Sequence, residues 1–169
     1  MFSREETPEV FADIHQYLGV IYAEIPDDVK KKSIWAGVSS ASFQEALRYY
    51  AKETHPYEYG MVCNNYANAL TQYPEAVHSD NREKAAFYYT EALSVRNAED
   101  WPLERAVTLL NYVENCWRLN LAGNDSDRAR FEQMQRYAQE AAQIAPDPAI
   151  TQAARAQLKQ LEQLREVVE

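Results

Sequence analysis

Three segments of this chain begin with a proline and have similar sequences, at intervals of 48 and 46 residues. They start at Pro8, Pro56 and Pro102, and each continues with apolar residues at the three- and four-residue spacing of a helix. Proline suits the first position of a helix, because the N–H that it lacks is not needed there. An internal repeat of this length predicts helical hairpins that stack into a continuous core.

Capping signals divide the rest of the chain. Ser42 and Asp80 are each followed three residues later by Glu, which is the capping-box pattern. Asp147 is a good N-cap residue before Pro148. The sequence therefore predicts seven helices, over residues 8–24, 42–54, 56–73, 81–96, 102–120, 126–145 and 148–167.

The second helix of each expected hairpin shares a pattern of small and aromatic residues. The copies contain Ala46 and Tyr50, then Ala85, Tyr89 and Ala92, and in looser form Met134, Ala138 and Ala141. In the first helices, Leu18-Gly19-x-x-Tyr22 corresponds to Tyr66-Ala67-x-x-Leu70 and to Tyr112-Val113-x-x-Cys116. Small residues permit close approach of helices, so Tyr22, Tyr50, Tyr66, Tyr89 and Tyr112 are expected at packing positions.

At these residues the chain resembles the tetratricopeptide repeat family, whose first helix carries a Leu-Gly-x-x-Tyr signature. The usual repeat has about 34 residues, so this period is longer. It is similar to the long repeats of kinesin light chains and of bacterial arrays, through Glu91-Ala92-Leu93 before Pro102 and Asn64-Asn65 after Pro56. The resemblance covers residues 8–146.

The resemblance implies an all-α fold, with a right-handed superhelix of three helical hairpins and a C-terminal capping helix. The repeats would occupy residues 8–54, 56–96 and 102–146, and the cap residues 148–168, within a single domain over 1–169.

Charge and composition exclude several classes of function. The chain has 26 acidic and 17 basic side chains, a net charge of −9, which disfavours nucleic acid and anionic membranes as partners. No apolar run has the length of a membrane span. The first ten residues carry Glu5, Glu6 and Glu9 and do not read as a secretory signal. With only 2 cysteines, a reduced cytoplasmic setting is expected.

The residues that carry catalytic chemistry do not form a recognisable motif. His15, His55 and His78 are far apart, and Glu75-x-x-His78 occurs once where a di-iron bundle needs two copies. Cys63 and Cys116 are expected as buried apolar side chains. We therefore expect no metal, no cofactor and no enzymatic activity.

Asparagines in the first helices indicate a binding surface. If Tyr66 and Tyr112 are equivalent core positions, Asn65 and Asn111 just before them border the concave groove of the repeats. An Asn amide can hold an extended peptide by its backbone. The alternative is that these two amides tie one repeat to the next. The candidate contact residues are Asn64, Asn65, Asn68, Asn111, Glu114, Asn115 and Arg118.

The segment 25–41 is a second candidate partner site. Its Pro, Gly and Ser content predicts a surface loop. Ile34, Trp35 and Val38 would then either fold onto the repeats or form a partner-binding patch.

These observations favour a non-catalytic adaptor or scaffold that binds a protein or peptide, neutral or basic because the chain is acidic. Two other hypotheses remain open. The chain could be a self-associating structural module, and hence a homo-oligomer, or an accessory subunit of an enzyme complex.

Overall fold

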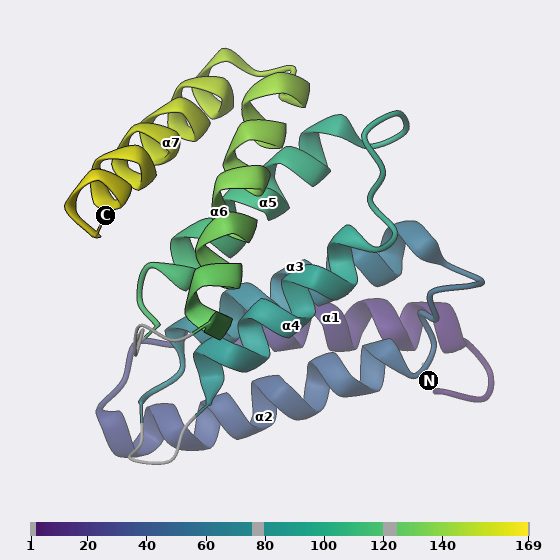
Figure 1. The fold of residues 1–169 in the computed structure, drawn as a ribbon. Coiled ribbons are helices and arrows are strands. Elements are labelled where there is room, and N and C mark those ends of the chain that lie inside the picture. The colour runs from purple at the N-terminus through teal and green to yellow at the C-terminus, as the bar shows by residue number, and fades with distance from the viewer. Residues whose placement is uncertain (1–2, 76–79, 120–124, 169) are drawn as a thin grey trace. The chain divides into compact units, whose positions relative to one another are not determined.

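The computed structural model describes residues 3–75, 80–119 and 125–168, in which every regular element is an α-helix. Figure 1 shows the seven helices of this part of the chain. They are α1 (Pro8–Glu24), α2 (Val29–Leu47), α3 (Pro56–Gln72), α4 (Asn81–Leu93), α5 (Pro102–Cys116), α6 (Asp125–Ile144) and α7 (Pro148–Val168). The predicted all-α class is confirmed.

Proline fixes the starts of four helices, as the sequence predicts. Pro8, Pro56, Pro102 and Pro148 all stand at the first helical position. Helices α4 and α6 also begin within one residue of their predicted starts. Helices α4 and α5 end three and four residues earlier than predicted. No proline or glycine directly follows either helix, so the sequence carries no clear signal for where it ends.

Helix α2 differs most from the prediction, because it begins at Val29 rather than at residue 42. The cap is Asp28, whose carboxylate accepts a hydrogen bond from the Lys31 backbone N–H at 3.1 Å. Ser42, the predicted cap, lies inside the helix, and its hydroxyl donates to the Val38 carbonyl oxygen at 2.9 Å. Most of the segment that was expected to be a loop is therefore helix.

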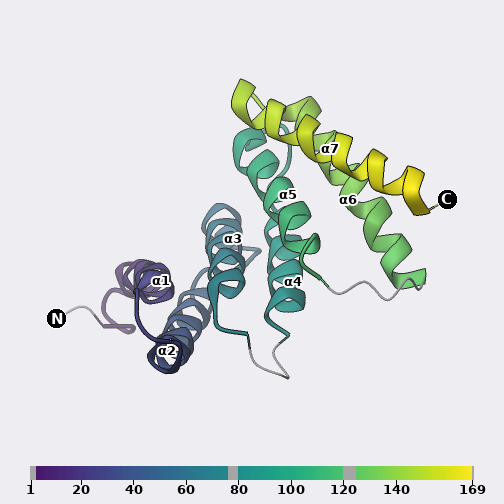
Figure 2. The same ribbon diagram turned by 90° about the vertical axis from the view of Figure 1, so that its left-hand side faces the viewer.

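The chain divides by its internal contacts into two compact units, Met1–Val95 and Arg96–Glu169. In the first, which we call unit 1, α1 packs against α2 and α3 against α4, so each pair forms a hairpin. Figure 2 views α1 nearly end-on, with α2 beside it. Helix α3 also contacts both α1 and α2, so the second hairpin stacks on the first through its first helix.

One column of packed side chains crosses all four helices of unit 1. It starts at Gly19 of α1, where an added Cβ would lie 2.8 Å from ring atoms of Phe43 in α2. Phe43 stacks on Tyr66 of α3 with ring centroids 5.0 Å apart, and Tyr66 contacts Tyr88 of α4 at 4.4 Å. The absent side chain at Gly19 is therefore what lets Phe43 lie against α1.

A buried chain of hydrogen bonds lies beside this column. The Tyr73 hydroxyl, just after α3, donates to Ser39 Oγ at 2.7 Å. Ser39 in turn donates to the Gly19 carbonyl oxygen at 2.5 Å. Because Ser39 is fully buried, these bonds satisfy its hydroxyl. They also join α1, α2 and the end of α3 a second time.

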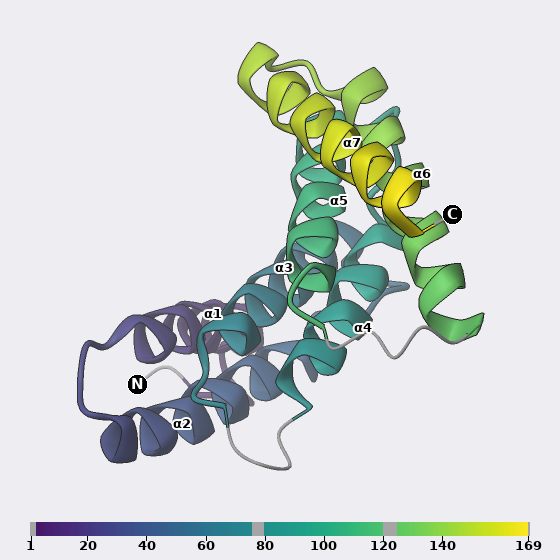
Figure 3. The ribbon, with the colours of Figure 1, turned by 60° about the vertical axis from the view of Figure 1, so that its left-hand side comes forward.

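The second unit, unit 2, contains α5, α6 and α7 (Figure 3). Helices α5 and α6 form a hairpin, and α7 contacts both of them, as α3 does α1 and α2. At the end of α5, the Trp117 indole N–H donates to the Gln157 side-chain oxygen of α7 at 2.6 Å. Small residues such as Ala138 and Ala154 are fully buried in the core of this unit.

The tyrosines expected at packing positions mostly lie in the core. Tyr50, Tyr66, Tyr89 and Tyr112 are all buried. Tyr22 is half-buried and stacks on Trp35 with ring centroids 5.6 Å apart. This part of the prediction is confirmed. None of the helices in the described ranges combines the length and the apolar content that a membrane span requires.

Two glycine substitutions test the packing at Gly19. We expect Gly19→Ala to destabilise unit 1 by about 1–3 kcal/mol, because its Cβ would overlap the fully buried ring of Phe43. Gly37→Ala is the matched control, since a Cβ there meets no described atom within 4 Å and Ala favours a helix over Gly by about 0.5–1 kcal/mol. Urea unfolding followed by circular dichroism measures both. Equal stability of the two variants would contradict the close approach.

Candidate functional site

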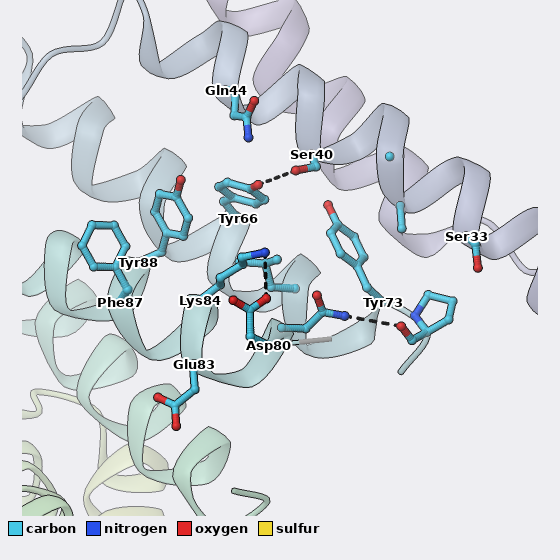
Figure 4. A pocket seen from close by; sticks show the side chains of 15 residues that line it. Ser33, Ser40, Gln44, Tyr66, Tyr73, Asp80, Glu83, Lys84, Phe87 and Tyr88 are labelled. Atoms are coloured by element: carbon cyan, nitrogen blue, oxygen red, sulfur yellow. Dashed lines mark hydrogen bonds and ion pairs between the residues drawn. The ribbon is translucent and has the colours of Figure 1, made fainter. Parts of the chain in front are cut away.

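A groove of about 700 Å³ lies on unit 1 between α2 and α4 (Figure 4). One face of α2 forms one wall, the second half of α3 and the turn after it form the floor, and the first two turns of α4 form the other wall. The groove exists because α3 lies between α2 and α4 and keeps these two helices apart.

Aromatic rings cover the floor and the α4 wall. Tyr66 of α3 is buried, and its ring contacts that of Tyr88. Next to Tyr88, the ring of Phe87 meets it edge-on at 5.2 Å, and Phe87 is 58% exposed. The groove therefore has an aromatic surface that is anchored in the core at Tyr66 and open to solvent at Phe87.

The α2 wall consists of four small residues and Gln44. Ser33, Ala36, Gly37 and Ser40 follow one another at spacings of three, one and three residues, which places them on one face of the helix. Among the described atoms, nothing lies within 4 Å of a Cβ placed on Gly37. Ser40 is hydrogen-bonded to the Tyr66 hydroxyl. A chain that enters the groove can approach the backbone of α2 closely along this wall.

Charged and amide groups lie at the start of α4. The Lys84 ammonium is 2.7 Å from the Asp80 carboxylate, and both are exposed. This hydrogen bond lowers the pKa of Asp80 and raises the pKa of Lys84. The side chain of Asp80 forms this ion pair, and no cap hydrogen bond from it is present in the described structure. Glu83 also lines the groove. The ionised side chains of the described lining, which are Asp80, Glu83 and Lys84, therefore carry a net charge of −1.

The hydroxyls of Tyr73 and Tyr88 in the groove are neutral over a wide pH range. Burial raises the pKa of Tyr88 to about 12, and its neighbours Tyr66, Cys63 and Glu91 add to the rise. Burial also raises the pKa of Tyr73 well above its ordinary value. At neutral pH the aromatic surface therefore carries no charge and can donate hydrogen bonds.

This arrangement is suited to holding a chain segment. Aromatic faces bind apolar side chains and, through their negative faces, cations. Hydroxyls and amides along the walls can bond a peptide backbone. The described lining contains neither His nor Cys.

Comparison of the chain with protein-family models, with curated proteins and with solved structures found no match. The tetratricopeptide resemblance therefore stays a prediction from the sequence.

The predicted binding asparagines of the second repeat lie on α3, in three different environments. Asn64 is buried at 7% exposure. Asn68 is half-buried and accepts a hydrogen bond from the Tyr89 hydroxyl at 2.7 Å, which links α3 to α4 within one hairpin. Asn65 is half-buried. Contact with a partner stays a prediction for all three, and Asn65 is the one that is neither in the core nor seen bonded to α4.

The remaining predicted contact residues lie in unit 2. Glu114 and Arg118 are exposed near the end of α5, and Asn111 is half-buried. Asn115 is buried at 2% exposure. These residues and the α3 asparagines belong to different units.

The residues of the expected partner loop belong to α2 instead. Trp35 folds onto α1, where it stacks on Tyr22 and donates from its indole N–H to Asp27 at 3.4 Å. Ile34 and Val38 are exposed at 59% and 37%. The loop interpretation is corrected: Trp35 packs on the first hairpin, and partner contact by Ile34 and Val38 stays a prediction.

No group of three or more His, Cys, Asp or Glu side chains in the described residues could hold a metal ion. Cys63 and Cys116 are buried, as predicted. His78 of the Glu75-x-x-His78 motif lies outside the described residues.

The groove was missed by the sequence analysis, although the sequence carries a signal for its exposed ring. Phe87, Tyr88 and Tyr89 are consecutive, and neighbours on a helix point about 100° apart, so one core cannot bury all three. Tyr89 is buried, Tyr88 is half-buried and Phe87 is exposed. The α2 wall could not be predicted, because most of its residues fall in the segment 25–41 that the sequence predicts as a loop, and a loop has no regular face.

The ionisation of Tyr88 predicts a loss of stability at high pH. Its ordinary pKa is about 10, so between pH 10 and 12 the unfolded chain releases a proton that the folded chain retains. The free energy of unfolding therefore falls as pH rises through this range. We expect the fall to be smaller in Tyr88→Phe, measured by urea unfolding at pH 9, 10 and 11. Identical pH dependence in both proteins would contradict the raised pKa.

Proposed function

We propose that this chain is a non-catalytic adaptor of tetratricopeptide type, which binds a peptide segment of a partner protein in the groove between α2 and α4. Its helices would belong to a right-handed superhelix of three hairpins closed by α7. The single observation that carries the proposal is the groove itself, which combines an aromatic floor, a wall of mostly small residues and an opening to solvent.

The packing of the helices supports the repeat assignment. In stacked helical repeats, the first helix of one hairpin packs against both helices of the hairpin before it. Helix α3 has this relation to α1 and α2, and α7 has it to α5 and α6. We infer that α7 occupies the position of a next first helix and acts as the cap.

The proposed ligand is an extended or helical segment of neutral or basic character. The chain carries a net charge of −9, and the groove has two carboxylates against one ammonium. A basic side chain would find the face of Phe87 and the carboxylate of Glu83 on the same wall. We propose a cytoplasmic setting, in which the buried thiols stay reduced.

Peptide selection tests this proposal. Random peptides of about 12 residues, an assumed length for filling a groove of this class, are selected on the immobilised chain and resynthesised with a fluorophore. We expect Phe87→Ala to weaken their binding at least about tenfold, because exposed aromatic anchors dominate such interfaces. Its stability should change little, since the ring is 58% exposed. Leu103→Ala, at a 42% exposed position in unit 2, is the matched control.

A second variant blocks the groove instead of emptying it. Gln44 is exposed and lines the α2 wall, so Gln44→Trp adds a ring across the groove without entering the core. We expect it to weaken the same peptides. Fluorescence anisotropy measures the peptide affinity of both variants. Unchanged affinity in Phe87→Ala and in Gln44→Trp would contradict the assignment of the peptide to this groove.

The double variant Asn65→Ala/Asn111→Ala distinguishes this groove from the one predicted along the first helices. With the peptide in the α2–α4 groove, we expect affinity to stay within about twofold. Loss of binding with an unchanged melting temperature would assign the peptide to the asparagines instead.

A further inference from the structure

The backbone around the groove between α2 and α4 offers little to an extended ligand. The α2 wall and the α3 floor lie inside helices, so their backbone N–H and C=O groups bond within those helices. The described ranges contain no strand, and hence no free sheet edge to which an extended peptide could add. Within the described lining, spare backbone N–H groups are expected in the first turn of α4.

Most polar side chains of the groove are already bonded within the protein. The Ser33 hydroxyl donates to a carbonyl oxygen of its own helix at 3.1 Å, and the Ser40 hydroxyl is bonded to that of Tyr66. Asp80 and Lys84 form an ion pair. An extended segment brings one N–H and one C=O per residue. Those that faced the walls would lose water without gaining enough partners, which costs free energy.

A helical segment does not have this requirement, because its backbone groups bond to one another. It would contact the groove through its side chains, as amphipathic helices do in the grooves of other proteins. Helices α2 and α4 both pack against α3. Packed helices lie about 8–10 Å apart, so a further helix over α3 comes within packing distance of both walls.

The α2 wall leaves room for such a helix. Ala36 and Gly37 lie between Ser33 and Ser40 on the face that lines the groove. No described atom lies within 4 Å of a Cβ placed on Gly37, so the protein itself does not fill this space. The distance between two packed helices depends on the side chains at their contact, and small ones permit the closest approach.

The charges of the groove lie on one wall. The ionised side chains of its described lining all belong to the start of α4, and the α2 wall and the floor carry none. A charged ligand side chain against α2 would lose water without meeting an opposite charge. A large apolar side chain would instead meet the rings of Phe87 and Tyr88. The groove therefore suits a ligand with an uncharged face toward α2 and α3.

We propose that the groove receives an amphipathic α-helix of a partner protein, which lies over α3 between α2 and α4. Its buried face is uncharged, with large apolar side chains against Phe87 and Tyr88, and it passes close to α2 at Gly37. The inference rests on the proposed function, because it names the conformation and the residue pattern of the segment that the groove binds.

Two peptide libraries of equal composition test the pattern. Each peptide has about 18 residues, which is long enough to form a helix. One library carries its apolar residues at the three- and four-residue spacing of a helix, and the other alternates apolar and polar residues as a strand does. Binders are kept if Phe87→Ala weakens them at least about tenfold. We expect these groove-dependent binders in the helix-spaced library, and finding them only in the alternating library overturns the inference.

The conformation of the tightest groove-dependent peptide is measured directly. With the peptide labelled with carbon-13, we expect its Cα chemical shifts to move to helical values in the complex. A proline at its centre should weaken binding at least about tenfold, because proline breaks a helix interior. A proline at its first position is the matched control, since a helix tolerates it there.

Two results contradict the inference in distinguishable ways. Extended Cα shifts in a peptide whose binding still depends on Phe87 overturn the helix and leave the proposed function standing. If no peptide of either library depends on Phe87, the proposed function fails and the inference fails with it.

A variant of α2 tests the close approach. Gly37→Leu adds bulk to an exposed position of the wall, so we expect it to weaken the helical peptide at least about tenfold, as overpacking of a close contact does. Gly37→Ala is the matched control and should change the affinity less than about threefold. Circular dichroism checks the fold of both variants. Equal affinity of the two would contradict the contact with α2.

Discussion

The close approach of α1 to Phe43 at Gly19 is the contact on which unit 1 depends. It fixes the position of the Phe43 ring, which supports Tyr66, which in turn supports Tyr88. Interiors are packed as densely as crystals, so a displacement at one end of such a column is felt at the other. Two of the four members also form the floor and wall of the groove. The shape of the groove is thus set by a residue of α1 that does not line it.

The fold was largely accessible from the sequence, because its signals are local. A proline at the first turn restricts its own backbone and needs no knowledge of the tertiary structure, so the starts of α1, α3, α5 and α7 are where the sequence predicts them. The start of α2 was not accessible in the same way. Its serines favour caps and loops in isolation, but Ser39 bonds to Gly19 of another helix. That contact is visible only after folding.

The candidate site was much harder to predict than the fold. Asparagine is a mediocre helix former, so its presence within a helix indicates a stabilising contact. The sequence does not show whether that contact is with a partner or with another part of the same chain. The structure supplies an internal reason for Asn68, whose amide oxygen accepts a hydrogen bond from Tyr89. The groove depends instead on the distance between α2 and α4 and on which of three adjacent aromatic residues is turned outward. Both are properties of packing between segments that are distant in the chain.

Helix α2 lines two grooves with sides that differ by a single residue in register. Ser33 and Ser40 line the groove between α2 and α4, Ile34, Val38 and Ala41 line a second groove of about 580 Å³ beside α1, and Gly37 lines both. Occupants of the two sides would therefore press on the same helix. If an occupant of one groove changed the affinity of the other groove by some factor, an occupant of the other would change the affinity of the first by the same factor, because linkage between two binding equilibria is reciprocal.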